Sequence, residues 1–163
     1  MQKYVTYGLG NKFNPDKLVT DLTCSIGKPA SAWWGSPINT EFGWKDWCKS
    51  ENFIPSRGLS FEEYFSDNNK IVWTLKEGSK ILLIDSIYDL NDFQRLDYIV
   101  EGKYDSWEFD FKKILNDGYT AIQLNDAGIG HYFMNRLELL MNSWDCESIV
   151  VLDPSKIVIL EGE

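Results

Sequence analysis

Two carboxylates and a hydroxyl stand together just before a short apolar run: Asp145, Glu147 and Ser148 precede Ile149–Leu152. The run is β-branched and stops at Asp153-Pro154, which predicts a buried strand followed by a turn. Desolvating a carboxylate is costly unless the group is paired or takes part in chemistry. Acidic residues at the mouth of a central strand therefore indicate a ligand site, although Asp145 could instead cap a turn.

A second group of candidate residues lies in segment 28–37, where small residues surround two indoles. The indole of Trp34 could stack on a flat ligand, and Lys28 supplies a cation that could meet a phosphate or carboxylate. Ser36 adds a hydroxyl in the same segment. We expect one of the two neighbouring indoles, Trp33 or Trp34, to belong to the core instead.

The third candidate feature is Tyr7-Gly8, at the end of a short β-type run over residues 4–7. A glycine that ends a strand lets a ligand or another backbone approach closely, and it also forms simple turns. Both interpretations remain open from this segment alone.

The length predicts a single domain over residues 1–163, and 44% hydrophobic and 15% aromatic residues suffice for its core. A net charge of −9 opposes broad binding to nucleic-acid phosphates, which depends on lysine and arginine. The chain has no secretory-type apolar region and no apolar run near membrane-spanning length, which predicts a soluble, cytoplasmic protein without membrane contact.

The cysteines do not form a metal-binding pattern. Cys24, Cys48 and Cys146 include no CxxC pair, and the chain has a single histidine, His131. This set does not fit a zinc site, so we expect free, buried thiols and no metal. We interpret His131 as a loop residue rather than a catalytic base.

The elements that must position these residues alternate irregularly between strands and helices. Apolar periodicity and breakers predict strands at 4–7, 71–75, 80–84, 119–124, 149–152 and 157–160. They predict helices at 17–22, 43–51, 89–100 and 107–115, a brief amphipathic element at 61–65 and a hairpin-type connection at 76–79. This order favours an α+β fold with a mixed or antiparallel sheet.

Three motifs together resemble a group of small phage and bacterial proteins. They are K-P-x-x-x-x-W-x-S-P at 28–37, G-W-x-x-W-C-x-x-E at 43–51 and W-D-C-[DE]-S-I at 144–149. Through them the chain resembles the diphtheria-toxin-like ADP-ribosyltransferase superfamily. The resemblance implies an α+β fold with an ADP-ribosyltransferase-like split mixed or antiparallel β-sheet core and flanking helices.

The resemblance also implies NAD as a substrate. In that superfamily the first strand ends in His-Gly or Arg, a second strand carries an aromatic and small-residue segment, and a late strand begins with Glu. Tyr7-Gly8 stands at the first position, and the segment containing Trp34 and Ser36 stands at the second. The nicotinamide would then be held by the Gly8 backbone and stacked on Trp34. Lys28 or Ser36 would replace the missing histidine at the ribose.

The acid of the late strand is ambiguous in this sequence. With the strand aligned on residues 150–153, the expected Glu falls on Ser148, and Glu147 lies one residue early, on the opposite face. A bulge could turn Glu147 inward, or Asp145 could be the acid. A carboxylate is needed because cleavage of the nicotinamide–ribose bond passes through a positively charged, oxocarbenium-like state.

These features and the resemblance predict a NAD-dependent mono-ADP-ribosyltransferase, of toxin, phage or phage-defence effector type. Its acceptor would be a macromolecule, with protein expected and nucleic acid left open, and an antitoxin or host protein could bind it. The alternative is a catalytically inactive acidic binding module of the same fold that occupies a host protein. A third hypothesis is a protein that binds NAD without transferring ADP-ribose.

Overall fold

The computed structural model describes residues 1–8, 14, 17–25, 27–55, 58–102, 107–125, 140–141 and 143–160. The strands in these ranges are β1 (Tyr4–Tyr7), β2 (Asp21–Ser25), β3 (Lys28–Ser31), β4 (Trp33–Pro37), β5 (Lys70–Leu75), β6 (Lys80–Ile84), β7 (Ile99–Glu101), β8 (Trp107–Phe109), β9 (Tyr119–Leu124), β10 (Ser148–Val151) and β11 (Ile157–Ile159). The helices are α1 (Trp44–Ser50), α2 (Phe61–Tyr64), α3 (Ile87–Arg95) and α4 (Phe111–Asn116), with short 3₁₀ turns at Asp67–Asn69 and Pro154–Lys156.

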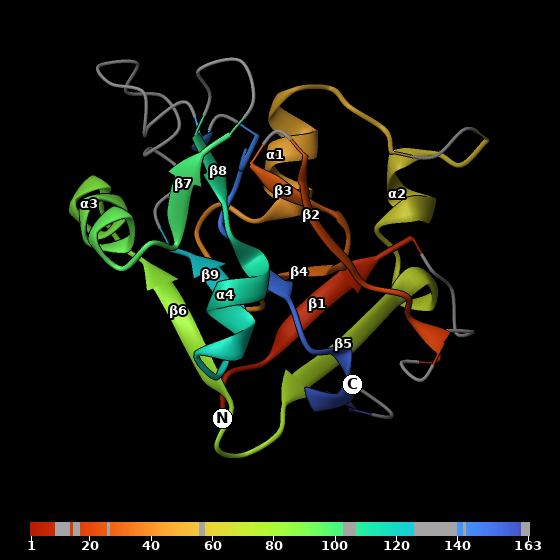
Figure 1. The fold of residues 1–163 in the computed structure, drawn as a ribbon. Helices are drawn as coiled ribbons and strands as arrows, with labels where there is room; N and C mark the ends of the chain where they lie inside the picture. Colours follow the sequence, from red (N-terminus) through yellow and green to blue (C-terminus); the bar gives the residue numbers. More distant parts are fainter. Residues whose placement is uncertain are drawn as a thin grey trace.

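A seven-stranded sheet organises the molecule, in the order β11-β5-β1-β4-β10-β9-β6 (Figure 1). Neighbouring strands are antiparallel except β6 and β9, which are parallel. The sheet is therefore mixed, and the fold is α+β, as the sequence predicts. None of the helices within the described ranges has the length and apolar character needed to cross a bilayer.

The sheet curls strongly between its two ends. Four strands separate β5 from β6, so a flat sheet would place them about 24 Å apart, at ~4.8 Å per strand. The chain from Leu75 to Lys80 can span only about 18 Å, at ~3.6 Å per residue. Segment 76–79 is thus not the predicted hairpin. It joins strands that do not pair, and the two halves of the sheet turn toward each other (Figure 1).

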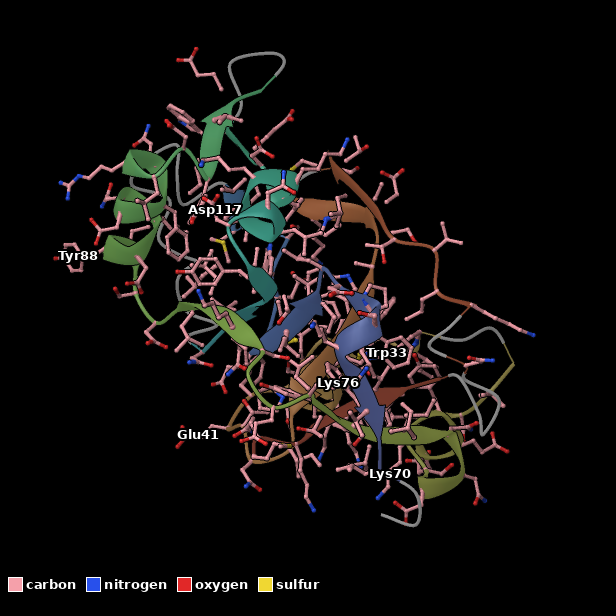
Figure 2. All side chains as sticks on the ribbon, turned by 60° about the horizontal axis from the view of Figure 1, so that its bottom comes forward. Trp33, Glu41, Lys70, Lys76, Tyr88 and Asp117 are labelled. Carbon is pink, nitrogen blue, oxygen red and sulfur yellow. The ribbon has the colours of Figure 1, made fainter. Side chains whose placement is uncertain are left out.

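Side chains alternate between two apolar clusters, one on each face of the sheet. One face buries Tyr4, Trp33, Trp73, Ile149 and Val151 in a single cluster. The other face packs strand residues of β6, β9 and β10 against helices α3 and α4 and against Trp144. Trp33 is a core indole at 4% exposure, whereas Tyr88 and Glu41 project outward (Figure 2). The prediction that one indole of the Trp33-Trp34 pair belongs to the core is therefore confirmed.

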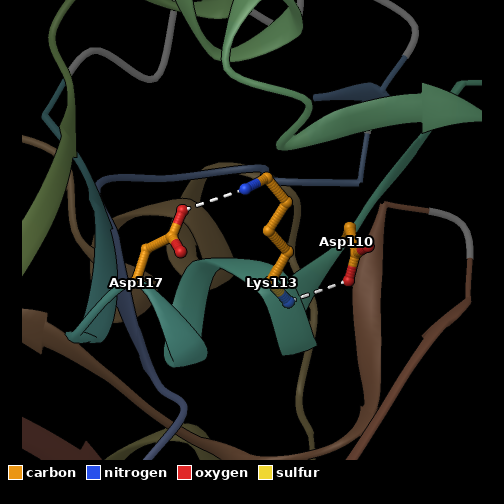
Figure 3. A network of polar contacts seen from close by, with 3 residues as sticks. All are labelled: Asp110, Lys113 and Asp117. Carbon is orange, nitrogen blue, oxygen red and sulfur yellow. Dashed lines mark hydrogen bonds and ion pairs between the residues drawn. The ribbon is translucent and has the colours of Figure 1, made fainter.

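Two small hairpins lie beside the main sheet, β2 with β3 and β7 with β8. Helix α4 follows β8 directly because the Asp110 carboxylate accepts the Lys113 backbone N–H at 2.9 Å and caps the helix. At the other end of α4 the Lys113 ammonium pairs with Asp117 at 3.1 Å (Figure 3). An acid at the start of a helix and a base near its end both favour the helix dipole.

Three helix predictions are wrong in part or in full. Residues 17–22 do not form a helix, because the chain enters strand β2 at Asp21 and pairs with β3. Helix 89–100 ends early: α3 stops at Arg95, Asp97 takes a left-handed φ of 57°, and Ile99 begins β7. The predicted helix 107–115 is strand β8 followed by α4. In each case pairing with another segment overrides local periodicity.

Candidate functional site

A cavity of about 290 Å³ opens where β1, β4 and β10 lie side by side. Six of the eight residues predicted for the site line it: Tyr7, Lys28, Trp34, Ser36, Asp145 and Ser148. The remaining lining residues are Val5, Thr6, Gly35, Trp44, Trp144 and Cys146. Gly8 and Glu147 do not line the cavity. Three segments that are distant in sequence therefore meet at one concave site.

Strand register explains why the predicted residues converge. Val5 of β1 pairs with Ser36 of β4, and Trp34 of β4 pairs with Val150 of β10. Paired residues point to the same face, and every second residue along a strand shares that face. Ser148, two residues from Val150, therefore joins Trp34 and Ser36 on the cavity side.

Aromatic side chains form the walls. The Trp34 and Trp144 rings meet edge to face with centroids 4.8 Å apart, and the Trp144 indole N–H donates to the Gly27 carbonyl at 2.9 Å. Trp44, at the start of α1, adds another wall. The sequence prediction placed Trp44 in a helix at 43–51 and assigned neither Trp44 nor Trp144 to the site. Trp144 directly precedes Asp145 in the sequence, and this position could have indicated that Trp144 belongs to the site.

The charged groups at the cavity form one ion pair. The Lys28 ammonium lies 3.9 Å from an Asp145 carboxylate oxygen, and each side chain is 36% exposed. The same ammonium lies 5.3 Å from the centre of the Trp34 ring, within cation–π range. A pair this exposed contributes little to stability, so both charges remain available to a polar ligand.

Two buried hydroxyls complete the polar lining. Ser36 is 4% exposed, and its oxygen accepts the Trp44 backbone N–H at 2.9 Å, which leaves its own proton to donate. Ser148 is 8% exposed, and its hydroxyl has no hydrogen-bond partner among the described residues. Hydroxyls placed this way can orient the hydroxyl groups of a sugar.

Tyr7 lies at the end of β1 with its ring against Phe65, at 4.9 Å between centroids. Burial raises the pKa of Tyr7, so its hydroxyl is neutral near pH 7 and can donate a hydrogen bond. Gly8 differs from its predicted role. Its N–H already donates to the Asn69 carbonyl at 2.9 Å, and it is not part of the cavity lining. The bond to Asn69 thus occupies one of the two hydrogen-bonding groups of the Gly8 backbone, which was expected to hold a nicotinamide.

The two candidate acids have different environments. Asp145 faces the cavity beside Lys28, whereas the Glu147 carboxylate accepts the Thr40 hydroxyl proton. The Glu147 backbone N–H also donates to the Phe42 carbonyl, at 3.0 Å. The strand position explains this, because Glu147 precedes the cavity-facing Ser148 by one residue and no bulge turns it inward. Of the two acids, it is therefore Asp145 that shares the cavity with Trp34.

Burial disfavours the reactive thiolate form of the cysteine in this region. Cys146 lines the cavity, and burial, reinforced by Asp145, raises the pKa of its thiol to about 12. A thiol in that state is almost entirely protonated at neutral pH and therefore unreactive. All three cysteines are free, and the described residues contain no cluster of three acidic, histidine or cysteine groups that could hold a metal. His131 lies outside the described residues.

The predicted site residues thus divide into a converging set and two that serve elsewhere. The converging set offers flat aromatic surfaces, one cation, one carboxylate and the hydroxyls of Tyr7, Ser36 and Ser148 around a small volume. Such a combination suits a ligand with a planar ring, a sugar and a negatively charged group. Among protein-family models, curated proteins and solved structures, none matches this chain.

Proposed function

We propose that this chain is a NAD-dependent mono-ADP-ribosyltransferase with an ADP-ribosyltransferase-like fold, acting in the cytoplasm on a macromolecular acceptor. One observation carries the proposal. The resemblance assigns the NAD site to the end of the first strand, to the segment with Trp34 and Ser36 and to the start of the late strand. These three segments contribute Tyr7, Trp34, Ser36, Asp145 and Ser148 to a single cavity. The curled mixed sheet that brings them together supports the same assignment.

The size of the cavity limits which part of NAD it can enclose. At about 290 Å³ it lies at the lower end of ligand pockets, which run from roughly 300 to 1,000 Å³. That volume suits the nicotinamide ring with its ribose, while the adenosine half would extend outside. Trp34 and Trp144 provide aromatic surfaces for the ring, and the exposed ammonium of Lys28 suits the pyrophosphate.

The reaction requires little chemistry from the protein. The bond between nicotinamide and ribose breaks with its electron pair going to the nicotinamide, which leaves as a neutral ring. The acceptor's nucleophile bonds to the anomeric carbon and loses a proton. Positive charge builds on the ribose in between, and the Asp145 carboxylate is the group of the cavity able to stabilise it. Ser36 and Ser148 would orient the ribose hydroxyls.

The test is transfer of label from NAD to acceptors in a cell lysate by the wild type and by Asp145→Asn. A carboxylate about 4 Å from developing charge contributes about 4 kcal/mol at an effective dielectric of 20, and solvent exposure lowers this to about 2–3 kcal/mol. We therefore expect kcat to fall roughly 30- to 150-fold. Asp92→Asn, an exposed aspartate of α3 that pairs with Arg95, is the control and should keep full activity. Absence of NAD consumption by the wild type would refute the activity.

A second candidate function is an inactive binding module of the same fold. It is favoured by Tyr7 in place of the family's histidine and by the Gly8 amide, which is already bonded to Asn69. With a net charge of −9, such a module would bind a basic protein surface. It predicts that the chain captures a defined basic partner and that this binding persists in the double variant Asp145→Ala/Glu147→Ala. Binding that depends on those two carboxylates alone would oppose it.

A further inference from the structure

The loop over residues 38–43 connects β4 to α1 and carries Trp44 to the cavity. Trp44 is the first residue of α1, and its backbone N–H donates to the Ser36 hydroxyl at 2.9 Å. This bond connects the end of the loop to β4. The Trp44 ring also stacks on Trp47 at 5.1 Å and meets Phe53 edge to face at 6.1 Å. The loop therefore sets where the Trp44 backbone enters α1, and these ring contacts act together with it to place the indole.

Close packing leaves the loop little freedom near its end. Gly43 is buried, and a Cβ atom added to it would lie 2.8 Å from the Thr40 methyl carbon and 3.1 Å from Ser36 Cβ. Contacts this short show that Thr40, Gly43 and β4 already fill the available space. A shift of Thr40 would therefore be transmitted to Gly43 and to the residue that follows it.

Glu147 contacts the same loop at two points. Its carboxylate accepts the hydroxyl proton of Thr40, and its backbone N–H donates to the Phe42 carbonyl at 3.0 Å. A hydrogen bond to an ionised carboxylate is about twice as strong as one between neutral groups. The second contact runs through the backbone, so only the first depends on the side chain. Glu147 thus joins the start of β10 to the loop that carries Trp44.

We infer that Glu147 is a positioning residue, whose carboxylate holds Thr40 and, through the 38–43 loop, helps to place the Trp44 indole as a wall of the cavity. The link to NAD rests on the proposed function, whereas the link from Glu147 to Trp44 does not. This assignment separates the two acids before β10. Asp145 contacts the substrate, whereas Glu147 acts on the cavity indirectly, through the 38–43 loop.

The experiment compares Glu147→Ala, Glu147→Gln and Thr40→Val by following the indole N–H resonance of Trp44, identified by its loss in Trp44→Phe. We expect this resonance to shift in Glu147→Ala and in Thr40→Val. The amide oxygen of Glu147→Gln still accepts the Thr40 hydroxyl, so this variant should restore the wild-type position. Glu41→Ala is the matched control, because Glu41 is an exposed acid in the same loop (Figure 2).

Kinetics provide the second measurement. Because Trp44 would contact NAD equally in the ground and transition states, its displacement should raise KM roughly tenfold and leave kcat within about threefold. Glu147→Ala and Thr40→Val remove the same bond, so the double variant should be no worse than either single variant. Asp145→Asn should show the opposite pattern, with the loss in kcat.

Two results would overturn the inference. One is a Trp44 resonance that stays in place in both Glu147→Ala and Thr40→Val. The other is a Glu147→Gln variant with a wild-type Trp44 resonance and KM but a kcat reduced a hundredfold or more, which would place the Glu147 charge in the chemistry. A wild type that consumes no NAD refutes the proposed function only, because the resonance measurement still decides the role of Glu147.

Discussion

Replacing Thr6 by valine removes one hydroxyl that connects three strands beneath the cavity. The Thr6 hydroxyl donates to the Trp34 carbonyl at 2.6 Å and accepts the Trp73 indole N–H at 3.0 Å. It therefore joins β1 to β4 and to β5. Trp73 is fully buried, so its N–H cannot turn to water for another partner. Valine keeps the shape of threonine but can make neither bond.

The magnitude follows from what the substitution leaves behind. A buried donor or acceptor without a partner costs about 1–3 kcal/mol. The Trp73 N–H should be at the upper part of this range, because its side chain is fully buried. We expect the free energy of unfolding to fall by about 3 kcal/mol in total. For a chain of this size that corresponds to a decrease in Tm of roughly 10 °C.

Urea denaturation followed by circular dichroism and tryptophan fluorescence measures this change. Thr6→Ser keeps the hydroxyl and should lose clearly less stability than Thr6→Val. Thr23→Val, on the exposed side of β2, should change the free energy of unfolding by less than about 0.5 kcal/mol. A Thr6→Val variant within 0.5 kcal/mol of wild type, with an unchanged slope m, would refute the reasoning.

Two further predictions concern stability. Gly27→Ala should lose more stability than Gly78→Ala in thermal melts. Both glycines have positive φ, but only at Gly27 would an added Cβ collide with the Leu140 carbonyl oxygen. Equal losses in the two variants would contradict this. Burial raises the thiol pKa of Cys48 and Cys146 to about 12, whereas an unfolded thiol ionises near pH ~8.5. Stability should therefore fall as pH rises from about 9 toward 12, and replacing both thiols by alanine should flatten that fall in urea titrations.

Local sequence signals predicted the strands that are buried on both faces. Ile71 to Leu75, Tyr119 to Leu124 and the run after Ser148 are β-branched or apolar without a helical period, and all three are strands. The breaker Gly43 and the tryptophans after it likewise predicted α1. These segments were predictable because their burial demands the same residue types wherever they lie in the sheet.

The predictions failed where pairing partners decide the structure. Ile99 and Val100 fit the apolar period of the preceding helix, and Trp107 with Phe109 fits the alternation of a strand as well as a helix. Pairing of Ile99 with Phe109 selects the strand in both segments. Asp110 could have indicated that the helix begins only at residue 111, because an aspartate is a preferred residue just before a helix. The sequence offered no comparable signal for the left-handed Asp97.

The sequence by itself determined which groups could do chemistry here: an acid pair before a buried strand, an indole with a lysine nearby, and a hydroxyl in each of two segments. Only the tertiary structure decided that Asp145 faces the cavity while Glu147 holds Thr40, and that the Gly8 amide is already used. The physical reason is that residue type limits which interactions are possible. Strand register and pairing, which depend on distant parts of the chain, decide which of them form.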